Sequence, residues 1–147
     1  MRKFALAVIA FAALVAGYAA PASAQLRVDV TQGNIQPLPI AIPDFIGDPS
    51  GAQIAGVVRA DLDRSGLFKV LDPKSFVEQV KDINTIPNFG NWRVINAQAL
   101  VTGQVQHQPD GRLRLDFRLW DVAGGSQMVG LQYYTTPDNW RRIAHLV

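Results

Sequence analysis

The chain contains no cysteine, so disulfide bonds are excluded and a hydrophobic core alone must stabilise the fold. The absence also excludes a lipid anchor of the bacterial lipoprotein kind, which needs cysteine as the first mature residue. There are two histidines, and neither has neighbouring metal ligands. We expect His107 to be solvated at a hairpin tip and His145 to lie off the apolar stripe of the last helix.

Recognisable catalytic motifs are also lacking. No glycine-rich phosphate loop and no nucleophile elbow occurs in the sequence. Asp44 and Asp48 flank a turn, but two carboxylates without the alternating oxygen ligands are weak evidence for calcium, and turn formation is the preferred interpretation. We therefore expect a protein that is not an enzyme and that uses no cofactor and no metal.

The first 24 residues have the three parts of a secretory signal peptide. Arg2 and Lys3 give a basic start, residues 4–18 are apolar, and a small-x-small pattern ends at Ala24. The apolar core is short and no stop-transfer charges follow it, which argues against a transmembrane anchor; the remaining alternative is a buried N-terminal helix. We predict cleavage after Ala24, export, and a soluble, non-lipidated protein in the periplasm.

Net charge gives no support for nucleic-acid binding. Removing residues 1–24 takes away two basic residues and no acidic one, which leaves twelve of each in the remaining 123 residues. Arg112, Arg114 and Arg118 form a row that resembles a nucleic-acid platform, but Asp116 interrupts it. A solvated sheet face is the preferred interpretation, and no nucleic-acid partner is expected.

One long helix is well marked in the sequence. Ser50 is placed to cap it, with Gln53 at the capping-box position, and Gly66 is placed to end it in a left-handed conformation. Arg59 falls outside its apolar face. The residues of that face are Ile54, Val57, Val58 and Leu62.

Period-two alternation predicts most of a sheet. In residues 112–121, Leu113, Leu115, Phe117 and Leu119 share one face, which predicts a sheet with one buried side. A strand is also predicted at 38–42. It contains Pro39, so either the strand lies near an edge of the sheet or the proline lies at the start of the strand. Further strands are predicted at 68–71, 99–106 and 127–134, and further helices at 75–80, 92–95 and from Pro137 onward. The fold class is α/β, a single domain with a mixed sheet packed by helices.

Two features near the chain ends leave alternatives open. Residues 26–31 alternate like a strand, which is either an edge strand of the protein's own sheet, the simpler interpretation, or a detachable strand that pairs with a partner. At the other end, the apolar stripe of Trp140, Ile143 and Val147 stops without a cap, which predicts a fragment of a longer protein. The three tryptophans are expected to pack in the core or between domains.

Five segments together resemble the amino-terminal domain of the TolB family. They are the short N-terminal strand of the mature chain, residues 39–45, residues 61–68, residues 95–103 and the hairpin at Asp110-Gly111. Their order and spacing extend the resemblance over essentially the whole mature chain. The resemblance implies an α/β domain at 34–147, which complete members of the family follow with a β-propeller that is absent from this chain.

The resemblance also implies a function and two partners. In the family, the propeller binds the lipoprotein Pal, and the N-terminal segment binds the C-terminal domain of the inner-membrane protein TolA. The system supports outer-membrane integrity and constriction during division. The alternative is a periplasmic regulator of another outer-membrane assembly. The TolA-binding segment maps here onto Gln25, Leu26, Arg27, Val28, Asp29, Val30, Thr31, Gln32 and Gly33.

Overall fold

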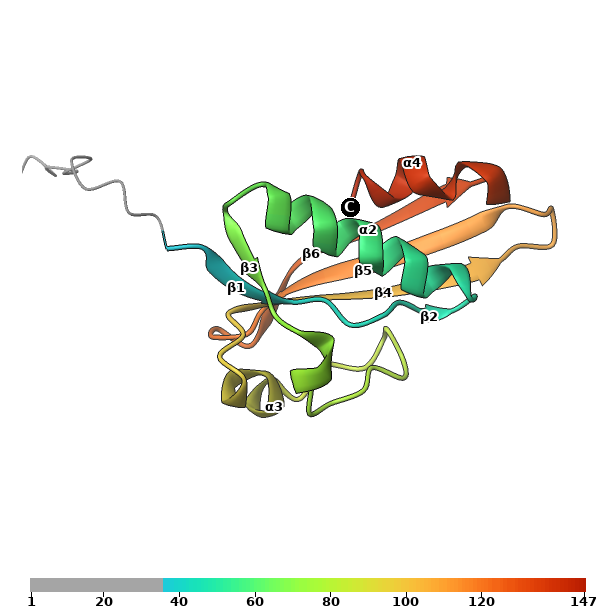
Figure 1. Ribbon diagram of the computed structural model, residues 1–147. Helices are drawn as coiled ribbons and strands as arrows, with labels where there is room; N and C mark the ends of the chain where they lie inside the picture. The colour runs from blue at the N-terminus through green and yellow to red at the C-terminus, as the bar shows by residue number, and fades with distance from the viewer. Residues whose placement is uncertain (1–35) are drawn as a thin grey trace, which may run out of the picture. The chain divides into compact units, whose positions relative to one another are not determined.

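The computed structural model describes residues 36–147 (Figure 1). The predicted signal peptide at 1–24, its cleavage site after Ala24 and the predicted partner-binding strand at 25–33 lie outside these residues. The described elements, in chain order, are β1 (Leu38–Ala41), β2 (Ile46–Gly47), α2 (Ser50–Arg64), β3 (Phe68–Val70), the 3-10 turn η1 (Pro73–Ser75), α3 (Phe89–Val94), β4 (Ala99–His107), β5 (Leu113–Asp121), β6 (Ser126–Thr135), the 3-10 turn η2 (Pro137–Asn139) and α4 (Trp140–Ala144).

The sheet is mixed, as predicted. Its strand order is β3-β1-β4-β5-β6, with β2 pairing to the far half of β4. β1 is parallel to both of its neighbours, whereas β4, β5 and β6 form an antiparallel meander. The predicted α/β class is therefore confirmed, and the edges of the described sheet are the short strand β3 and the long strand β6.

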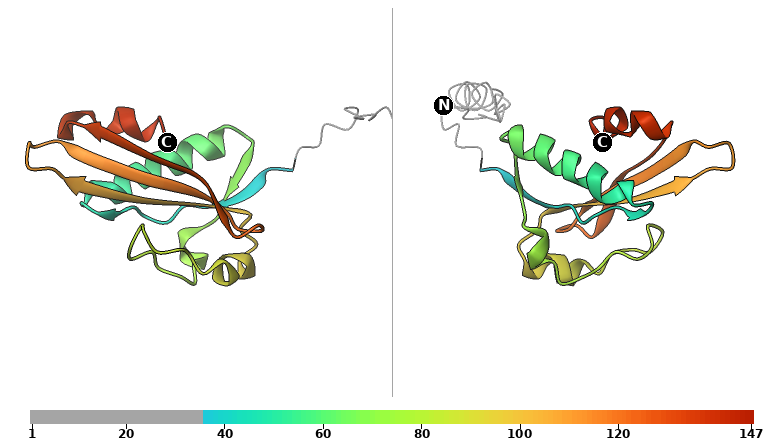
Figure 2. Two further views of the ribbon diagram at one scale, coloured as in Figure 1. Left: turned by 180° about the vertical axis from the view of Figure 1, so that it is seen from behind. Right: turned by 45° about the vertical axis from the view of Figure 1, so that its right-hand side comes forward.

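Two helices, α2 and α4, cover one face of the sheet (Figure 2). The predicted apolar stripe of α2 faces the sheet, and Ile54 and Val58 are buried in the same core cluster as Leu113 and Leu115 of β5. Burying side chains of this size contributes roughly 1.5–3 kcal/mol each, so the packing of α2 stabilises the fold substantially. Trp140 and Ile143 of α4 pack partly buried against the same cluster.

The other face is covered near one end only, by α3 and the irregular segments around it (Figure 2). Trp92 of α3 is fully buried there, and Trp120 of β5 lies beside it in a second core cluster. The indole nitrogen of Trp120 donates to the hydroxyl of Thr102 at 3.0 Å, which satisfies both buried polar groups. Core packing is thus the role of these two tryptophans, as expected.

Two local predictions are wrong. Ser50 does not cap α2, because the Asp48 carboxylate accepts the Ser50 backbone N–H at 2.8 Å and Ser50 is itself the first helical residue. An anionic acceptor at a helix N-terminus also complements the helix dipole, so Asp48 is physically the better cap. The predicted second helix, opened by Asp72-Pro73 and continuing through Ser75 to Val80, is only the 3-10 turn Pro73–Ser75 capped by Asp72, after which Phe76 is extended. Gly66 does have the predicted left-handed φ, +72°.

Candidate functional site

The segment between β1 and α2 is fixed by two contacts with distant parts of the chain. Arg59 of α2 donates to the carbonyl of Ile42 at 2.7 Å and to the Asp44 carboxylate at 2.9 Å. The Phe45 ring lies on Gly103 in the middle of β4, so close that a Cβ there would come within 2.5 Å of the ring carbons. Two of the segments that carry the family resemblance, 39–45 and 95–103, therefore pack directly against each other through Phe45 and Gly103.

The two carboxylates that were considered for calcium have protein partners instead. Asp44 pairs with Arg59 at 2.9 Å. Asp48 caps α2 and lies 2.6 Å from His107 at the end of β4. Hydrogen bonds from Ser50, and then the contact with His107, lower the pKa of Asp48 below its ordinary value. Within residues 36–147 no group of three or more acidic, histidine or cysteine side chains could hold a metal ion.

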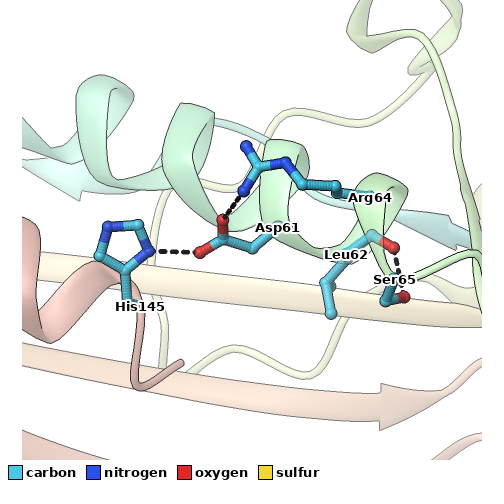
Figure 3. A network of polar contacts seen from close by, with 5 residues as sticks. All are labelled: Asp61, Leu62, Arg64, Ser65 and His145. Atoms are coloured by element: carbon cyan, nitrogen blue, oxygen red, sulfur yellow. Dashed lines mark hydrogen bonds and ion pairs between the residues drawn. The ribbon is translucent and has the colours of Figure 1, made fainter.

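His145 also has an aspartate partner, and this pair joins α4 to α2. Its ring nitrogen Nδ1 lies 2.5 Å from one oxygen of Asp61, and Arg64 donates to the other oxygen at 3.2 Å (Figure 3). His145 is off the apolar stripe of α4, as expected. The Asp61 carboxylate thus lies between two basic side chains, His145 and Arg64. Its contact with His145 links the residue that follows α4 to the last turns of α2.

The arginine row consists of Arg112, just before β5, and of Arg114 and Arg118 in β5, whose side chains lie on the sheet face opposite α2 and α4; each arginine has a different partner. Arg112 pairs with Asp110 at 2.7 Å, and its hydrogen bonds lower the pKa of that carboxyl. Arg114 pairs with Asp116 at 2.9 Å, which raises the pKa of the guanidinium. Arg118 donates to the Asn84 side-chain oxygen at 2.8 Å and has no carboxylate partner among the described residues.

This face of β4, β5 and β6 is hollowed. The hollow has a volume of about 600 Å³, and Asn84 from the segment before α3 closes one side of it. Its wall is mostly amide and guanidinium groups, which can hydrogen-bond to a ligand or to solvent. Its polar lining includes Gln104, Arg114, Asp116, Arg118, Gln127 and Gln132.

Strand β6 beside this hollow is the feature that sequence reasoning missed. Its ten residues carry no charge, and Met128, Val129, Leu131 and Tyr134 are exposed. The signal was present in the sequence, because a strand with no Lys, Arg, Asp, Glu or Pro lacks the groups that usually protect a sheet edge. Nothing in the sequence alone, however, indicated that this strand is at the edge.

Fold and site together define an α/β domain with helices on one sheet face, a polar hollow on the other and one unprotected edge strand. Residues 26–128 match the model of the TolB amino-terminal domain. The chain therefore belongs to this family.

Solved structures share the fold. The crystal structure of TolB from Acinetobacter baumannii matches with a TM-score of 0.61 and 23% identity over 76% of this chain. The match covers 26% of that protein, so this chain spans about a quarter of its length. The lipoprotein GNA1162 from Neisseria meningitidis matches with a TM-score of 0.53 and 15% identity, over 70% of this chain and 84% of that one. The C-terminal domain of LpoB from Salmonella enterica has a TM-score of 0.52 and 12% identity, over 68% and 82% respectively. At these identities the matches show the fold alone.

The helices between residues 36 and 147 are all too short or too polar to cross a membrane.

Proposed function

We propose that the chain is the amino-terminal part of a non-enzymatic periplasmic adaptor of the Tol-Pal system. In this proposal residues 25–33 bind the C-terminal domain of TolA, and a propeller present in the complete protein binds Pal. The adaptor links the inner to the outer membrane and supports outer-membrane integrity and invagination during division. Family membership supports the system, and the topology of the sheet supports the role of the N-terminal segment.

The position of β1 is the observation that carries this proposal. β1 begins at Leu38, shortly after the segment 25–33, and it is paired with β3 on one side and β4 on the other. A strand that directly precedes β1 therefore has no free position beside it. The six described strands form their sheet within residues 38–135, and this supports a proposal in which residues 25–33 pair with another protein.

The experiment is a calorimetric titration of the TolA C-terminal domain with three partners: the intact protein, a protein lacking residues 25–33, and a peptide of those nine residues. We expect the intact protein and the peptide to bind and the truncated protein to lose binding while it keeps its melting temperature. In the peptide, Val28→Pro removes a backbone N–H and should weaken binding at least tenfold, whereas Arg27→Lys keeps the backbone and is the matched control. A truncated protein that is folded and binds TolA as tightly as the intact one contradicts the proposal.

A periplasmic regulator of another outer-membrane assembly is the second candidate. The fold likeness to the LpoB C-terminal domain, over 82% of that domain, favours it. That likeness is of fold alone, whereas the TolB match is of family, so the adaptor is the preferred function. Recovery of another envelope complex instead of TolA and Pal after crosslinking in cells would favour the regulator.

A further inference from the structure

Strand β6 is an open edge of the described sheet. Its register pairs it with β5 on one side, and no described strand pairs with the other side. In the rear view of Figure 2 it runs along the near side of the sheet. Alternate backbone N–H and C=O groups on an edge strand point away from the sheet, and these groups can pair with an added strand.

The two edges of the sheet are protected to different extents. β3 has three residues, one of which is the charged Lys69, whereas β6 has ten residues and no charge. The ladder between β5 and β6 has one irregularity, near Met128, and continues in regular register from Val129 to Thr135. Soluble proteins usually shorten, charge or bend such an edge. An edge left long, regular and uncharged is therefore suited to accepting a strand.

The two faces of β6 differ, and the difference sets the chemistry of the partner. Val129 and Leu131 lie on the face that carries α2 and α4, with exposures of 38% and 48%. On the opposite face, Gly130 lies in register between Arg118 of β5 and the open edge. The side-chain amide of Gln127 lies where a side chain at Gly130 would be, 2.7 Å from an ideal Cβ, and this places an amide donor between Arg118 and the open edge.

Arg118 is also the arginine of β5 that has no carboxylate partner among the described residues. An added strand would lie two strand spacings, roughly 10 Å, from β5. An arginine and a glutamate side chain can together span that distance, with Arg118 exchanging its hydrogen bond to Asn84 for a charge-assisted one to the carboxylate. Charge complementarity thus favours an acidic residue in the partner at this register.

We propose that β6 accepts an extended segment of a partner protein in which apolar and acidic residues alternate. Its apolar side chains cover Val129 and Leu131, and an acidic side chain pairs with Arg118 beside the polar hollow. The backbone ladder supplies affinity and the alternation supplies specificity. This interface goes beyond the proposed function, because it lies on β6 and not on the segment 25–33.

The test uses the purified protein and a blocked eight-residue peptide of alternating valine and glutamate. Binding is followed by NMR titration and by amide hydrogen exchange. We expect the peptide to slow amide exchange in β6. Two control peptides should bind at least tenfold more weakly: one in which lysine replaces every glutamate, and one that keeps valine and glutamate but is N-methylated at alternate residues. Arg118→Gln should weaken binding of the glutamate peptide about tenfold, as expected when one charge-assisted hydrogen bond is lost.

A second variant separates the interface from general stability. Leu131→Glu places a like charge in the edge and should abolish binding, whereas Val94→Glu adds the same charge at a residue of α3 that is 76% exposed and should change nothing. Equal binding of the glutamate and lysine peptides, or no effect of Leu131→Glu in a variant with an unchanged melting curve, overturns the proposal. So does protection of β6 by dimerisation, which assigns the edge to a second copy. Binding seen only after removal of residues 25–33 assigns the edge to this chain's own segment and likewise overturns it.

Discussion

Replacing Gly103 by alanine should destabilise the domain, because the new methyl group has no space. An ideal Cβ at this position would lie 2.5–2.7 Å from three carbons of the Phe45 ring. The ring is buried, with 4% exposure, so it cannot rotate into solvent. Its residue is held on the other side as well, since the Phe45 carbonyl oxygen contacts the first turn of α2 so closely that a Cβ at Gly51 would meet it.

The magnitude follows from two opposing terms. Overpacking a well-packed core by one methyl group costs about 1–3 kcal/mol. Replacing glycine by alanine restricts the unfolded chain and returns about 0.4–1 kcal/mol. Because the clash is with a buried ring, the overpacking cost falls in the upper part of its range, about 2–3 kcal/mol, so the expected net loss is about 1–2.6 kcal/mol and the melting temperature falls by several degrees.

The assay is urea unfolding followed by tryptophan fluorescence, with a glycine-to-alanine change elsewhere as the control. Gly56 in α2 has open space around its Cβ position and a helical setting, so Gly56→Ala should raise stability by about 0.5–1 kcal/mol. Phe45→Leu should cost less in the Gly103→Ala background than in the wild type, because the two changes relieve each other. A Gly103→Ala protein that is as stable as the wild type would refute this account of the corner between β1 and α2.

Three further predictions concern single contacts. Thr102→Val leaves the buried indole N–H of Trp120 without an acceptor and should cost about 1–3 kcal/mol in urea unfolding. The pKa of Asp48 is lowered by folding, so its contribution to stability is complete above the unfolded pKa and is lost as pH falls through the folded value. The difference in unfolding free energy between the wild type and Asp48→Asn should therefore be constant above about pH 5 and shrink at lower pH, as measured by urea titrations at several pH values. His145→Gln should lower stability by less than about 1 kcal/mol at pH 6, because the contact with Asp61 is exposed; a larger loss in thermal unfolding would contradict this estimate.

The elements that the sequence predicted well are those in which periodicity extends over many residues. β5 alternates between apolar and polar residues from Leu113 to Leu119, and its burial follows this alternation up to Arg118; the apolar face of α2 is the one that packs on the sheet. The helix predicted at 75–80 did not form because tertiary packing overrides local propensity: Phe76 is extended, and its ring packs edge-to-face on Trp92 with the ring centroids 5.3 Å apart. Pro39 lies at the second residue of an interior strand, so of its two interpretations the start of a strand is the correct one.

The candidate site was less accessible to sequence reasoning, for a physical reason. His145 and Asp61 are 84 residues apart, and the contact exists only because α4 packs on α2. The partner of Arg118, Asn84, comes from an irregular segment that carries no periodic signal. The edge position of β6 depends on the order of strands, which local patterns do not contain. Side-chain chemistry could be identified in advance, but neighbours across the sheet could not.

The two proposed interfaces, residues 25–33 and the edge strand β6, should act independently of each other. If residues 25–33 donate a strand to TolA, that pairing extends the sheet of TolA and leaves β6 unchanged. If β6 accepts a strand, the sheet of this domain grows at the edge that is long and uncharged, because β3 offers only three residues. Removal of residues 25–33 should therefore abolish the first interaction and retain the second, whereas Leu131→Glu should do the reverse. A single change that abolished both would mean that the two surfaces are parts of one interface.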